Sequence, residues 1–512
     1  MSGAAPSRAA GAVRASVRDA GDGARSIVLP VAIRTREVVH TAEAGSDEGR
    51  YDLVIVGGGP GGYAVALYGA AAGLSIAMVE KDKVGGTCLH RGCIPAKEFL
   101  ETASVYRTVG AAGEFGIAAG PPTVDFAVSL ERKGKVVDQL FKGLTGLLRR
   151  RNVTTLSGVG RLGADHTVHV TGSDGSMTEL RGTNVVLATG SVPRLIPGFV
   201  AGGFVLTSDE VLELDHIPPA VAVIGGGAIG CEFASMLSDL GAHVTLLEVL
   251  PNILPGCDRE VADVVVRSFK KRGIIVRTGV AVRGHEPNGH GTTVLFGDGE
   301  RVDVDVVVVS VGRRPLSEGL CDEGTGVEID ERGFVSVDPW MRTKAEGVFA
   351  VGDLVATPQL AHVGFAEGIL VVKQILGEPA VPVDYGAVPW CIYCHPEVAF
   401  VGMTEDAARA AGFDVVVQRD PFAGNGRARI LGETEGLVKV IAEKTPSGGA
   451  GRLLGVHMVG PWVTEQLGQA YLAVNWEATP GEIAQFVQPH PTLSETFGET
   501  VLALTGRGLH VG

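Results

Sequence analysis

Two cysteines separated by four residues are the first candidates for chemistry in this 512-residue chain. Cys88 and Cys93 lie in the segment GGTCLHRGCIPAK, residues 85–97. Residues five apart on a regular helix rise about 7.5 Å, more than the Cα separation of about 7 Å beyond which a disulfide does not close. A bridge therefore needs an irregular turn, which Gly92 can supply, with Pro95 tolerated in the first turn of a helix. A helix beginning here would direct its dipole at the sulfurs and favour a thiolate. The pattern predicts a dithiol–disulfide redox pair, and the alternative is two buried structural cysteines.

Two glycine-rich turns have the spacing of dinucleotide-binding sites. Their glycines are Gly57, Gly59 and Gly62 in the first turn, and Gly225, Gly227 and Gly230 in the second. Such glycines permit a tight turn, admit a pyrophosphate and pack a helix against a strand. Glu80 and Glu248 each follow the first glycine of their turn by 23 residues, where a carboxylate can accept both ribose hydroxyls. The repeat predicts two nucleotide sites rather than two helix-packing turns.

Glu248 also predicts which nicotinamide cofactor the second site prefers. It is followed by Val249, Leu250 and Pro251, so no Arg or Lys is at hand for a 2′-phosphate. Because a carboxylate would repel that phosphate, we expect NAD rather than NADP.

The elements around both turns predict an α/β protein. Each turn follows a short β-branched run and precedes a helical stretch and a second strand: residues 53–56, 63–72 and 75–80, then residues 221–224, a helix through 240, and residues 243–248. After Tyr385 the pattern changes to strands at 437–442 and 452–458, with helices near 404–411 and 464–477, which indicates a separate α+β domain.

Composition excludes several classes of protein. The length suggests roughly three domains, and 45% hydrophobic with 20% charged residues suits a large core. The net charge of −14 argues against nucleic acid and anionic membranes as partners. The best apolar run, 304–309, is broken by Asp305 and is expected to be a buried strand, so we expect a soluble protein. Seven thinly spread cysteines do not form a secreted disulfide framework, which favours the cytoplasm and a catalytic disulfide.

Residues 1–50 differ from the rest of the chain. They are rich in Ala, Gly, Ser and Arg and contain no Lys. Asp19, Asp22 and Glu37 spoil the acid-poor character of a transit peptide. We expect a poorly ordered extension, with a targeting or docking segment as alternatives.

Together these motifs resemble those of the flavin-dependent pyridine nucleotide–disulfide reductases, over residues 51–512. The resemblance implies two Rossmann-like domains, for FAD and NAD, and an α+β dimerisation domain. The implied ranges are 51–190 for the first part of the FAD domain, 191–318 for the NAD domain, 319–385 for the second, central part of the FAD domain, and 386–512 for the interface domain.

The resemblance also assigns roles around the cysteines. Cys88 would be the interchange thiol that meets the substrate, and Cys93 the charge-transfer thiolate against the flavin. Lys97 would lie near flavin N5, with Glu232 as its carboxylate partner.

Further cofactor-binding residues are implied by other strings. Residues 347–353, GVFAVGD, resemble the second FAD motif of the family, in which the aspartate, here Asp353, binds the ribityl chain. Gly190, Gly312 and Ala361 complete the implied cofactor-binding set. Val363 stands where a lysine is usual.

The string HPTLSE, residues 490–495, resembles the acid–base motif of the family. A dithiol must lose a proton before it attacks a disulfide, so His490 would be the base, and Glu495 would orient the imidazole. In the family this histidine reaches the disulfide of the other subunit, which implies a homodimer. Gln488 replaces a histidine that relatives often carry.

A second cysteine pair, Cys391 and Cys394, forms a C-x-x-C. Without another such pair a zinc site is weakly supported, and the surrounding string matches the family's interface strand. We expect structural packing and no metal site.

Within the family, the resemblance is greatest to enzymes that oxidise protein-bound dihydrolipoamide with NAD⁺. It implies, as partners, lipoyl domains of 2-oxo acid dehydrogenase complexes or a glycine cleavage carrier protein. The main alternative is a related reductase of a low-molecular-weight disulfide, a quinone or a metal ion. A non-catalytic flavoprotein subunit is disfavoured because Cys88, Cys93 and His490 are all present.

Overall fold

A computed structural model describes residues 49–510 of the chain. The predicted N-terminal extension, with its targeting and docking alternatives, lies outside the described residues except for its last two positions. Arg50 begins strand β1 (Arg50–Val56), one residue before the predicted start of the fold.

The first sheet has seven strands in the order β3-β2-β1-β6-β5-β4, with β17 also pairing with β6. Its other strands are β2 (Ile76–Glu80), β3 (Thr154–Ser157), β4 (Val159–Leu162), β5 (Thr167–Thr171), β6 (Met177–Leu187) and β17 (Val348–Ala350). β3, β2, β1, β6 and β17 are parallel neighbours, whereas β4 and β5 are antiparallel. Because β17 comes late in the chain, the polypeptide leaves this sheet and returns to it.

The second sheet is fully parallel, in the order β11-β10-β9-β15-β8. Its strands are β8 (Val205–Leu206), β9 (Ala220–Ile224), β10 (His243–Leu247), β11 (Ile275–Arg277) and β15 (Val306–Val309). Helix α6 (Ala228–Asp239) connects β9 to β10, as α1 (Pro60–Ala71) connects β1 to β2. The predicted repeat of strand, glycine turn, helix and strand is therefore confirmed.

The expectation of one buried strand at 304–309 was wrong in its extent, because only residues 306–309 form such a strand. Val304 ends strand β14 (Glu300–Val304), and β15 starts at Val306 in a different sheet. Between them the Asp305 carboxylate accepts a hydrogen bond from the backbone N–H of Ala220 at 2.7 Å. The apolar run is thus divided by a polar residue that caps the start of β9.

Two small antiparallel sheets accompany the parallel ones. One is β12-β13-β14 and the other is β16-β7. The remaining strands are β12 (Val282–Pro287), β13 (Thr292–Phe296), β7 (Ser191–Pro193) and β16 (Arg313–Pro315).

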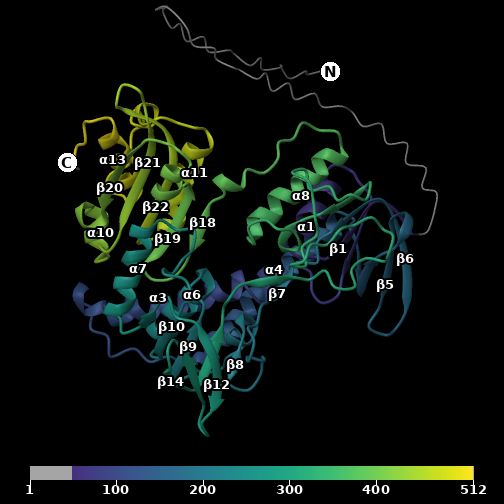
Figure 1. Cartoon of the computed structure of the whole chain (residues 1–512), viewed down its shortest axis with the longest axis horizontal. Coiled ribbons are helices and arrows are strands. Elements are labelled where there is room, and N and C mark those ends of the chain that lie inside the picture. Colours follow the sequence, from purple (N-terminus) through teal and green to yellow (C-terminus); the bar gives the residue numbers. More distant parts are fainter. Residues whose placement is uncertain (1–48, 511–512) are drawn as a thin grey trace, which may run out of the picture. The chain divides into compact units, whose positions relative to one another are not determined.

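The C-terminal part is built on an antiparallel sheet in the order β18-β19-β22-β21-β20 (Figure 1). Its strands are β18 (Trp390–Ile392), β19 (Glu397–Gly402), β20 (Val415–Pro421), β21 (Leu437–Lys444) and β22 (Ala450–Gly460). Its helices are α9 (Glu405–Ala410), α10 (Gly426–Leu431), α11 (Val463–Asn475), α12 (Pro480–Ile483) and α13 (Glu495–Leu504). The predicted α+β character of this part is confirmed.

The other α-helices precede the C-terminal part in the sequence. They are α2 (Gly86–His90), α3 (Cys93–Gly110), α4 (Phe126–Arg150), α5 (Ser208–Val211), α7 (Arg259–Lys271) and α8 (Ala361–Ile375). Helix α8 packs closely on α1, because a Cβ atom at Gly368 would lie 2.9 Å from the Gly61 carbonyl oxygen. This packing brings the return segment around β17 to the first glycine turn.

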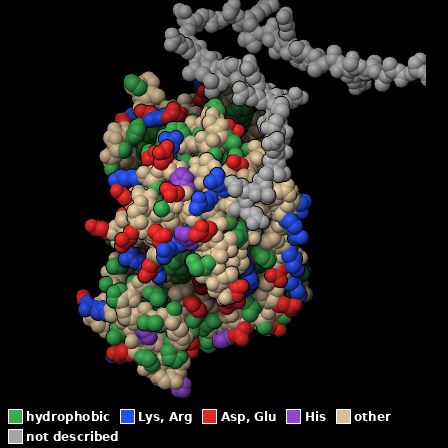
Figure 2. All heavy atoms as spheres, turned by 90° about the vertical axis from the view of Figure 1, so that its right-hand side faces the viewer, with side chains coloured by type: hydrophobic (Ala, Val, Ile, Leu, Met, Phe, Trp, Pro, Cys, Tyr) green, Lys and Arg blue, Asp and Glu red, His purple; other side chains and the backbone are tan. Residues whose placement is uncertain are grey.

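On the face drawn in Figure 2, acidic and basic side chains are interspersed over the described surface. Within residues 49–510, the structure holds no helix whose length and apolar character would let it cross a bilayer.

Candidate active site

The two redox-candidate cysteines sit at a helix junction. Cys88 lies in the short helix α2, and Cys93 is the first residue of α3. Between them Arg91 donates its N–H to the Thr87 carbonyl at 2.8 Å, and Gly92 adopts a non-helical conformation. A Cβ at Gly92 would come within 3.0 Å of that same carbonyl oxygen. The irregular turn that the spacing predicts is therefore present, and it places Cys93 at a helix N-terminus.

The electrostatic environment separates the two thiols. The hydrogen bond from the Cys88 thiol lowers the pKa of Cys93 to about 7, and the Lys97 ammonium acts in the same direction against burial. The same hydrogen bond, together with burial, raises the pKa of Cys88. Cys93 is therefore the sulfur that carries negative charge near neutral pH. The other charged or titratable groups that face it are Glu232, Tyr63 and Arg313.

Lys97 and Glu232 form an ion pair, which is the contact that the resemblance to the family implied. The Lys97 ammonium lies 2.9 Å from both carboxylate oxygens of Glu232. Burial opposes the charge on Lys97, but the Glu232 carboxylate raises its pKa above the ordinary value. Glu232 also accepts the backbone N–H of Tyr393 at 2.9 Å, and the Lys97 ammonium lies 4.8 Å from the centroid of the Tyr393 ring. The ion pair joins α3, the helix that begins at Cys93, to α6 and to the C-terminal part.

The two glycine turns have the same internal geometry. A Cβ at Gly62 would lie 1.9 Å from the carbonyl oxygen of Gly57, and one at Gly230 would lie 1.8 Å from that of Gly225. These positions require glycine because helix and turn touch there. In contrast, a Cβ at Gly227 would meet nothing within 4 Å, so the middle of that turn is open.

Glu80 and Glu248 both contact their glycine turns. Glu80 accepts the N–H of Gly58 at 2.7 Å, and Glu248 accepts the N–H of Gly226 at 2.5 Å. Each carboxylate also accepts a second backbone N–H two residues further on, from Asp82 and Leu250 respectively. Both glutamates therefore hold the turn beside the end of the strand, where a ribose would lie in a dinucleotide site.

Asp353 belongs to a polar network that the sequence did not reveal. It lies in the 3₁₀ turn Gly352–Leu354 and accepts a hydrogen bond from Ser191 Oγ at 2.5 Å. Arg313 donates from Nε to Ser191 Oγ at 2.7 Å and approaches Thr87 Oγ1 at 3.5 Å. This network connects the predicted second FAD motif to helix α2, which carries Cys88. Sequence reasoning predicted Asp353 and the glycines Gly190 and Gly312 but missed the two residues that bind Asp353. Ser191 and Arg313 each directly follow one of those glycines, and this adjacency was the signal that could have identified them.

The remaining predicted cofactor residues mark open or incompletely bonded positions. Gly190 has open space around its missing side chain, and so does Gly312. Ala361 begins helix α8 two residues after Gln359, whose amide nitrogen is buried without a partner among the described residues. Ser310 Oγ, beside the second glycine turn, is likewise buried and unbonded within residues 49–510. Open glycine turns and unused donors fit dinucleotide cofactors at both turns.

His490 and Glu495 pair in the C-terminal part. The imidazole Nδ1 lies 2.8 Å from Glu495 Oε2. The His490 side chain is 72% exposed, whereas that of Glu495 is 13% exposed and also meets the N–H of Thr492. Within the described residues, His490 forms its hydrogen bond with Glu495 and not with either cysteine. The imidazole is therefore oriented by Glu495 and is exposed, without a hydrogen bond to Cys88 or Cys93 among the described residues.

The second cysteine pair is divided between two environments. Cys391 Sγ lies 3.8 Å from the Thr464 carbonyl, and the buried Cys394 lies 3.3 Å from the Pro396 carbonyl. Burial raises the pKa of Cys391 to about 11. These contacts suit thiols packed as neutral side chains.

Comparison with family models covers most of the chain. The model described as pyridine nucleotide-disulphide oxidoreductase matches residues 51–368, and the dimerisation domain of the same family matches residues 388–501.

Named relatives match over similar lengths. The dihydrolipoyl dehydrogenase of Bacillus subtilis is 40% identical over 474 residues, covering 90% of this chain and 99% of the relative. That of Thermus scotoductus is also 40% identical, over 468 residues, with the same coverage. Among solved structures, LpdA from Mycobacterium tuberculosis aligns with a TM-score of 0.83 at 27% identity, over 89% of this chain and 99% of that one. The flavoprotein disulfide reductase RclA of Escherichia coli, described as induced by HOCl, aligns with a TM-score of 0.79 at 27% identity, over 88% and 99%.

Proposed function

The chain belongs to the pyridine nucleotide-disulphide oxidoreductases, and on that premise we propose that it acts as a dihydrolipoyl dehydrogenase. The observation that carries the proposal is the Cys88–Cys93 pair at the start of α3, held beside the Lys97–Glu232 ion pair. The first glycine turn, which fits FAD, lies against Gly86 of α2. The second, which fits NAD, leads into helix α6, which carries Glu232. The enzyme is a flavoprotein oxidoreductase, since the family and its named members use FAD and NAD.

The proposed reaction oxidises a dithiol. Dihydrolipoamide and NAD⁺ give lipoamide, NADH and one proton. The two S–H bonds of the substrate are lost, one S–S bond forms, and the electron pair leaves as hydride on NADH. When bound, FAD carries that electron pair between the cysteine pair and the nicotinamide.

We assign the steps of thiol exchange to residues of this chain. His490 removes a proton from the substrate dithiol, with Glu495 holding the imidazole and stabilising its charged form. The resulting thiolate attacks Cys88 Sγ of the oxidised pair, and Cys93 departs as the thiolate. The lowered pKa of Cys93 makes it the better leaving group. Lys97 stabilises that negative charge, and Glu232 keeps Lys97 in place.

Assembly is part of the proposal. The chain carries the family's dimerisation domain. We propose a homodimer in which the exposed His490 serves the redox pair of the partner subunit, because His490 and Cys88 are not joined within one chain. In this proposal residues 51–190 and 319–385 bind FAD, 191–318 bind NAD and 386–512 form the interface.

The proposed partners follow from the substrate. Lipoyl domains of 2-oxo acid dehydrogenase complexes, or a glycine cleavage carrier protein, would present the dihydrolipoamide. We propose a cytoplasmic location, since seven scattered cysteines suit a reducing compartment.

Steady-state kinetics with the purified, FAD-loaded enzyme tests the proposal. We expect NAD⁺-dependent oxidation of dihydrolipoamide to exceed turnover of glutathione disulfide, quinones or metal ions with NADH, as measured by kcat/KM. Cys88→Ser is the matched control, because it retains the flavin site and removes the interchange thiol. A low-molecular-weight disulfide, quinone or metal ion with the higher kcat/KM would overturn the proposed substrate and establish the related reductase activity instead.

A further inference from the structure

A polar face of helix α6 continues beyond Glu232. Ser235 and Asp239 follow it at helical spacing and are buried with it on the same side of the helix. The Asp239 side chain is 4% exposed. Three buried polar groups in one row on a helix need partners, since unpaired ones would be costly.

Asp239 receives its partners from two other helices. Its Oδ2 accepts a hydrogen bond from Arg107, in the last turn of α3, at 2.5 Å. Its Oδ1 accepts one from Arg272, which caps the C-terminus of α7, at 2.5 Å. The Asp239 carboxylate thus joins α3, the helix that begins at Cys93, to helices α6 and α7.

Ser235 extends the same contact to the C-terminal part. Its Oγ accepts the N–H of His395 at 2.9 Å, while Arg272 donates to Ser235 Oγ at 3.1 Å and to the His395 carbonyl at 2.5 Å. The positive charge of Arg107 also acts on Glu433 and His395. It opposes the burial that raises the pKa of Glu433, and it adds to the burial that lowers the pKa of His395. Together with the contact between Glu232 and Tyr393, this row fixes segment 393–395 along α6.

Helix α3 is therefore tied to α6 at two points. Lys97 binds Glu232 near the redox end, and Arg107 binds Asp239 about 15 Å further along the helix. Ala96, Phe99 and Ala103 of α3 also pack in a buried apolar cluster, so loss of one tie would permit a small tilt of α3 rather than a free rotation. With Lys97 as the pivot, a sway of about 1 Å at Arg107 would move Cys93 by about 0.4 Å. Displacements of this size matter because reaction rates fall steeply when reacting groups are misplaced.

We propose that Asp239 is a positioning residue, which through Arg107 holds helix α3 in register so that Cys93 and Lys97 keep their places beside the flavin. This inference rests on the proposed function of Cys93 as the charge-transfer thiolate. It assigns to Asp239 no contact with substrate or cofactor.

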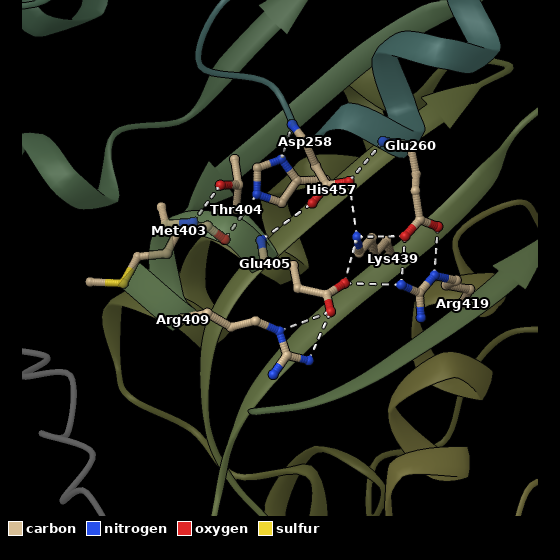
Figure 3. A network of polar contacts seen from close by, with 10 residues as sticks. Asp258, Glu260, Met403, Thr404, Glu405, Arg409, Arg419, Lys439 and His457 are labelled. Carbon is tan, nitrogen blue, oxygen red and sulfur yellow. Dashed lines mark hydrogen bonds and ion pairs between the residues drawn. The ribbon is translucent and has the colours of Figure 1, made fainter. Parts of the chain in front are cut away.

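A second network offers a matched control. In Figure 3, Lys439 of β21 lies among the carboxylates of Asp258, Glu260 and Glu405, at 2.9 to 3.0 Å. Arg419 pairs with Glu260 and Glu405 at its edge. This network joins the N-terminus of α7 to the C-terminal part, but it has no contact with α3 among the described residues. It should contribute to stability without controlling Cys93.

The test compares Arg107→Gln with Arg419→Gln. The Arg107 side chain is 29% exposed and that of Arg419 is 41% exposed. Each substitution removes one guanidinium from a charged cluster that joins neighbouring elements. The enzyme is reduced with two electron equivalents, and the long-wavelength absorbance of the thiolate against oxidised flavin is titrated with pH. Because Lys97 favours the Cys93 thiolate, we expect Arg107→Gln to raise the titration midpoint by about half a pH unit. It should also lower kcat about 5- to 10-fold with KM for dihydrolipoamide nearly unchanged.

Arg419→Gln should lower the Tm and leave the midpoint and kcat as in the wild type. Arg107→Lys keeps the ion pair with Asp239, so its titration midpoint should lie close to that of the wild type. Asp239→Asn should show at least the effects of Arg107→Gln, because it also weakens the contact of Asp239 with Arg272. The double variant should be no worse than Asp239→Asn, because the contact between Arg107 and Asp239 is already lost in that single variant. If Arg107→Gln and Asp239→Asn change only the Tm, as Arg419→Gln does, the positioning role is wrong. A wild-type enzyme without the long-wavelength band would overturn the role of Cys93 itself, and this inference with it.

Discussion

At the scale of single residues, the two redox thiols are chemically unequal before any substrate arrives. Cys93 has a pKa lowered to about 7 by the hydrogen bond from Cys88, with help from Lys97, whereas Cys88 has its pKa raised. The inequality follows first from the direction of that hydrogen bond. Position adds to it, since Cys93 begins helix α3 whereas Cys88 lies within α2.

This inequality predicts different behaviour of the two serine variants. Cys93→Ser should abolish the long-wavelength absorbance of the two-electron-reduced enzyme, because it removes the thiolate that contacts the flavin. Cys88→Ser should keep a thiolate beside the flavin and retain the band. Both variants should lose dihydrolipoamide oxidation, as measured by NADH formation. Full activity in either one would contradict the assignment of the pair.

Glu248 is the residue expected to select the nicotinamide cofactor. It is buried and accepts the N–H groups of Gly226 and Leu250, so its charge is held where a ribose would bind. We expect kcat/KM for NAD⁺ to exceed that for NADP⁺ by about 100-fold or more, since a 2′-phosphate would meet this carboxylate.

Glu248→Gln should narrow the ratio between the two cofactors, because the amide keeps the shape and one acceptor oxygen but loses the charge. The matched control is Glu80→Gln in the other turn, where the same loss of charge should leave the ratio unchanged. Equal kcat/KM for NAD⁺ and NADP⁺ in the wild type would show that Glu248 does not discriminate between the two cofactors.

At the scale of elements, the glycine turns are constrained by contact as well as by conformation. Gly225 and Gly241 have the same φ of 107°, in the left-handed region that favours glycine. A Cβ at Gly225 would lie 2.4 Å from the Ser310 carbonyl oxygen, whereas one at Gly241 would meet nothing within 4 Å. Substitutions at Gly225 and Gly241 therefore distinguish the cost of backbone strain, which both share, from the cost of steric overlap, which only Gly225 has.

We expect Gly241→Ala to lower the free energy of unfolding by about 1–2 kcal/mol, from backbone strain alone. Gly225→Ala should lower it by more than about 3 kcal/mol, because β9 and β15 must also move apart. Gly225→Ala should in addition raise KM for NAD⁺, whereas Gly241→Ala should not. Chemical denaturation and NAD⁺ kinetics measure both effects, and equal losses in the two variants would contradict a role for the overlap.

At the scale of the whole molecule, the site is divided between two parts of the chain. The cysteines lie at the α2–α3 junction, while the oriented imidazole of His490 is 72% exposed in the C-terminal part. In a homodimer with the imidazole acting across the interface, each site would need residues from both subunits.

That arrangement predicts complementation between inactive chains. In a heterodimer of His490→Gln and Cys88→Ser subunits, one of the two sites would combine an intact Cys88 with an intact His490. Because loss of the base should cost roughly 10²–10⁴-fold, activity of the heterodimer should stand well above that of either parent. Co-expression with two affinity tags isolates the heterodimer for the assay. If the heterodimers are no more active than their parents, His490 does not act on the cysteines of the partner subunit, and it acts either within its own chain or not at all.

Much of this protein could be predicted from local patterns in the sequence. The glycine spacing and the glutamates that follow predicted both Rossmann units, because a tight strand-to-helix turn restricts which residues can occupy it. The spacing of Cys88 and Cys93 predicted the irregular turn for a similar reason, since a regular helix would hold the sulfurs apart. The division of residues 304–309 was not predicted, because hydrophobicity does not reveal that Asp305 binds the N–H of Ala220, 85 residues away.

Only the tertiary structure decided how distant polar residues pair. Ser191 and Arg313 reach Asp353 because β7 pairs with β16 and β17 returns to β6. Asp239 meets Arg107 because α6 packs on α3, and nothing in either helix's own sequence marks that contact. Motifs can be recognised in the sequence because they depend on backbone geometry over only a few consecutive residues. The partners of buried charges are fixed by how helices and sheets pack, which depends on the whole chain at once.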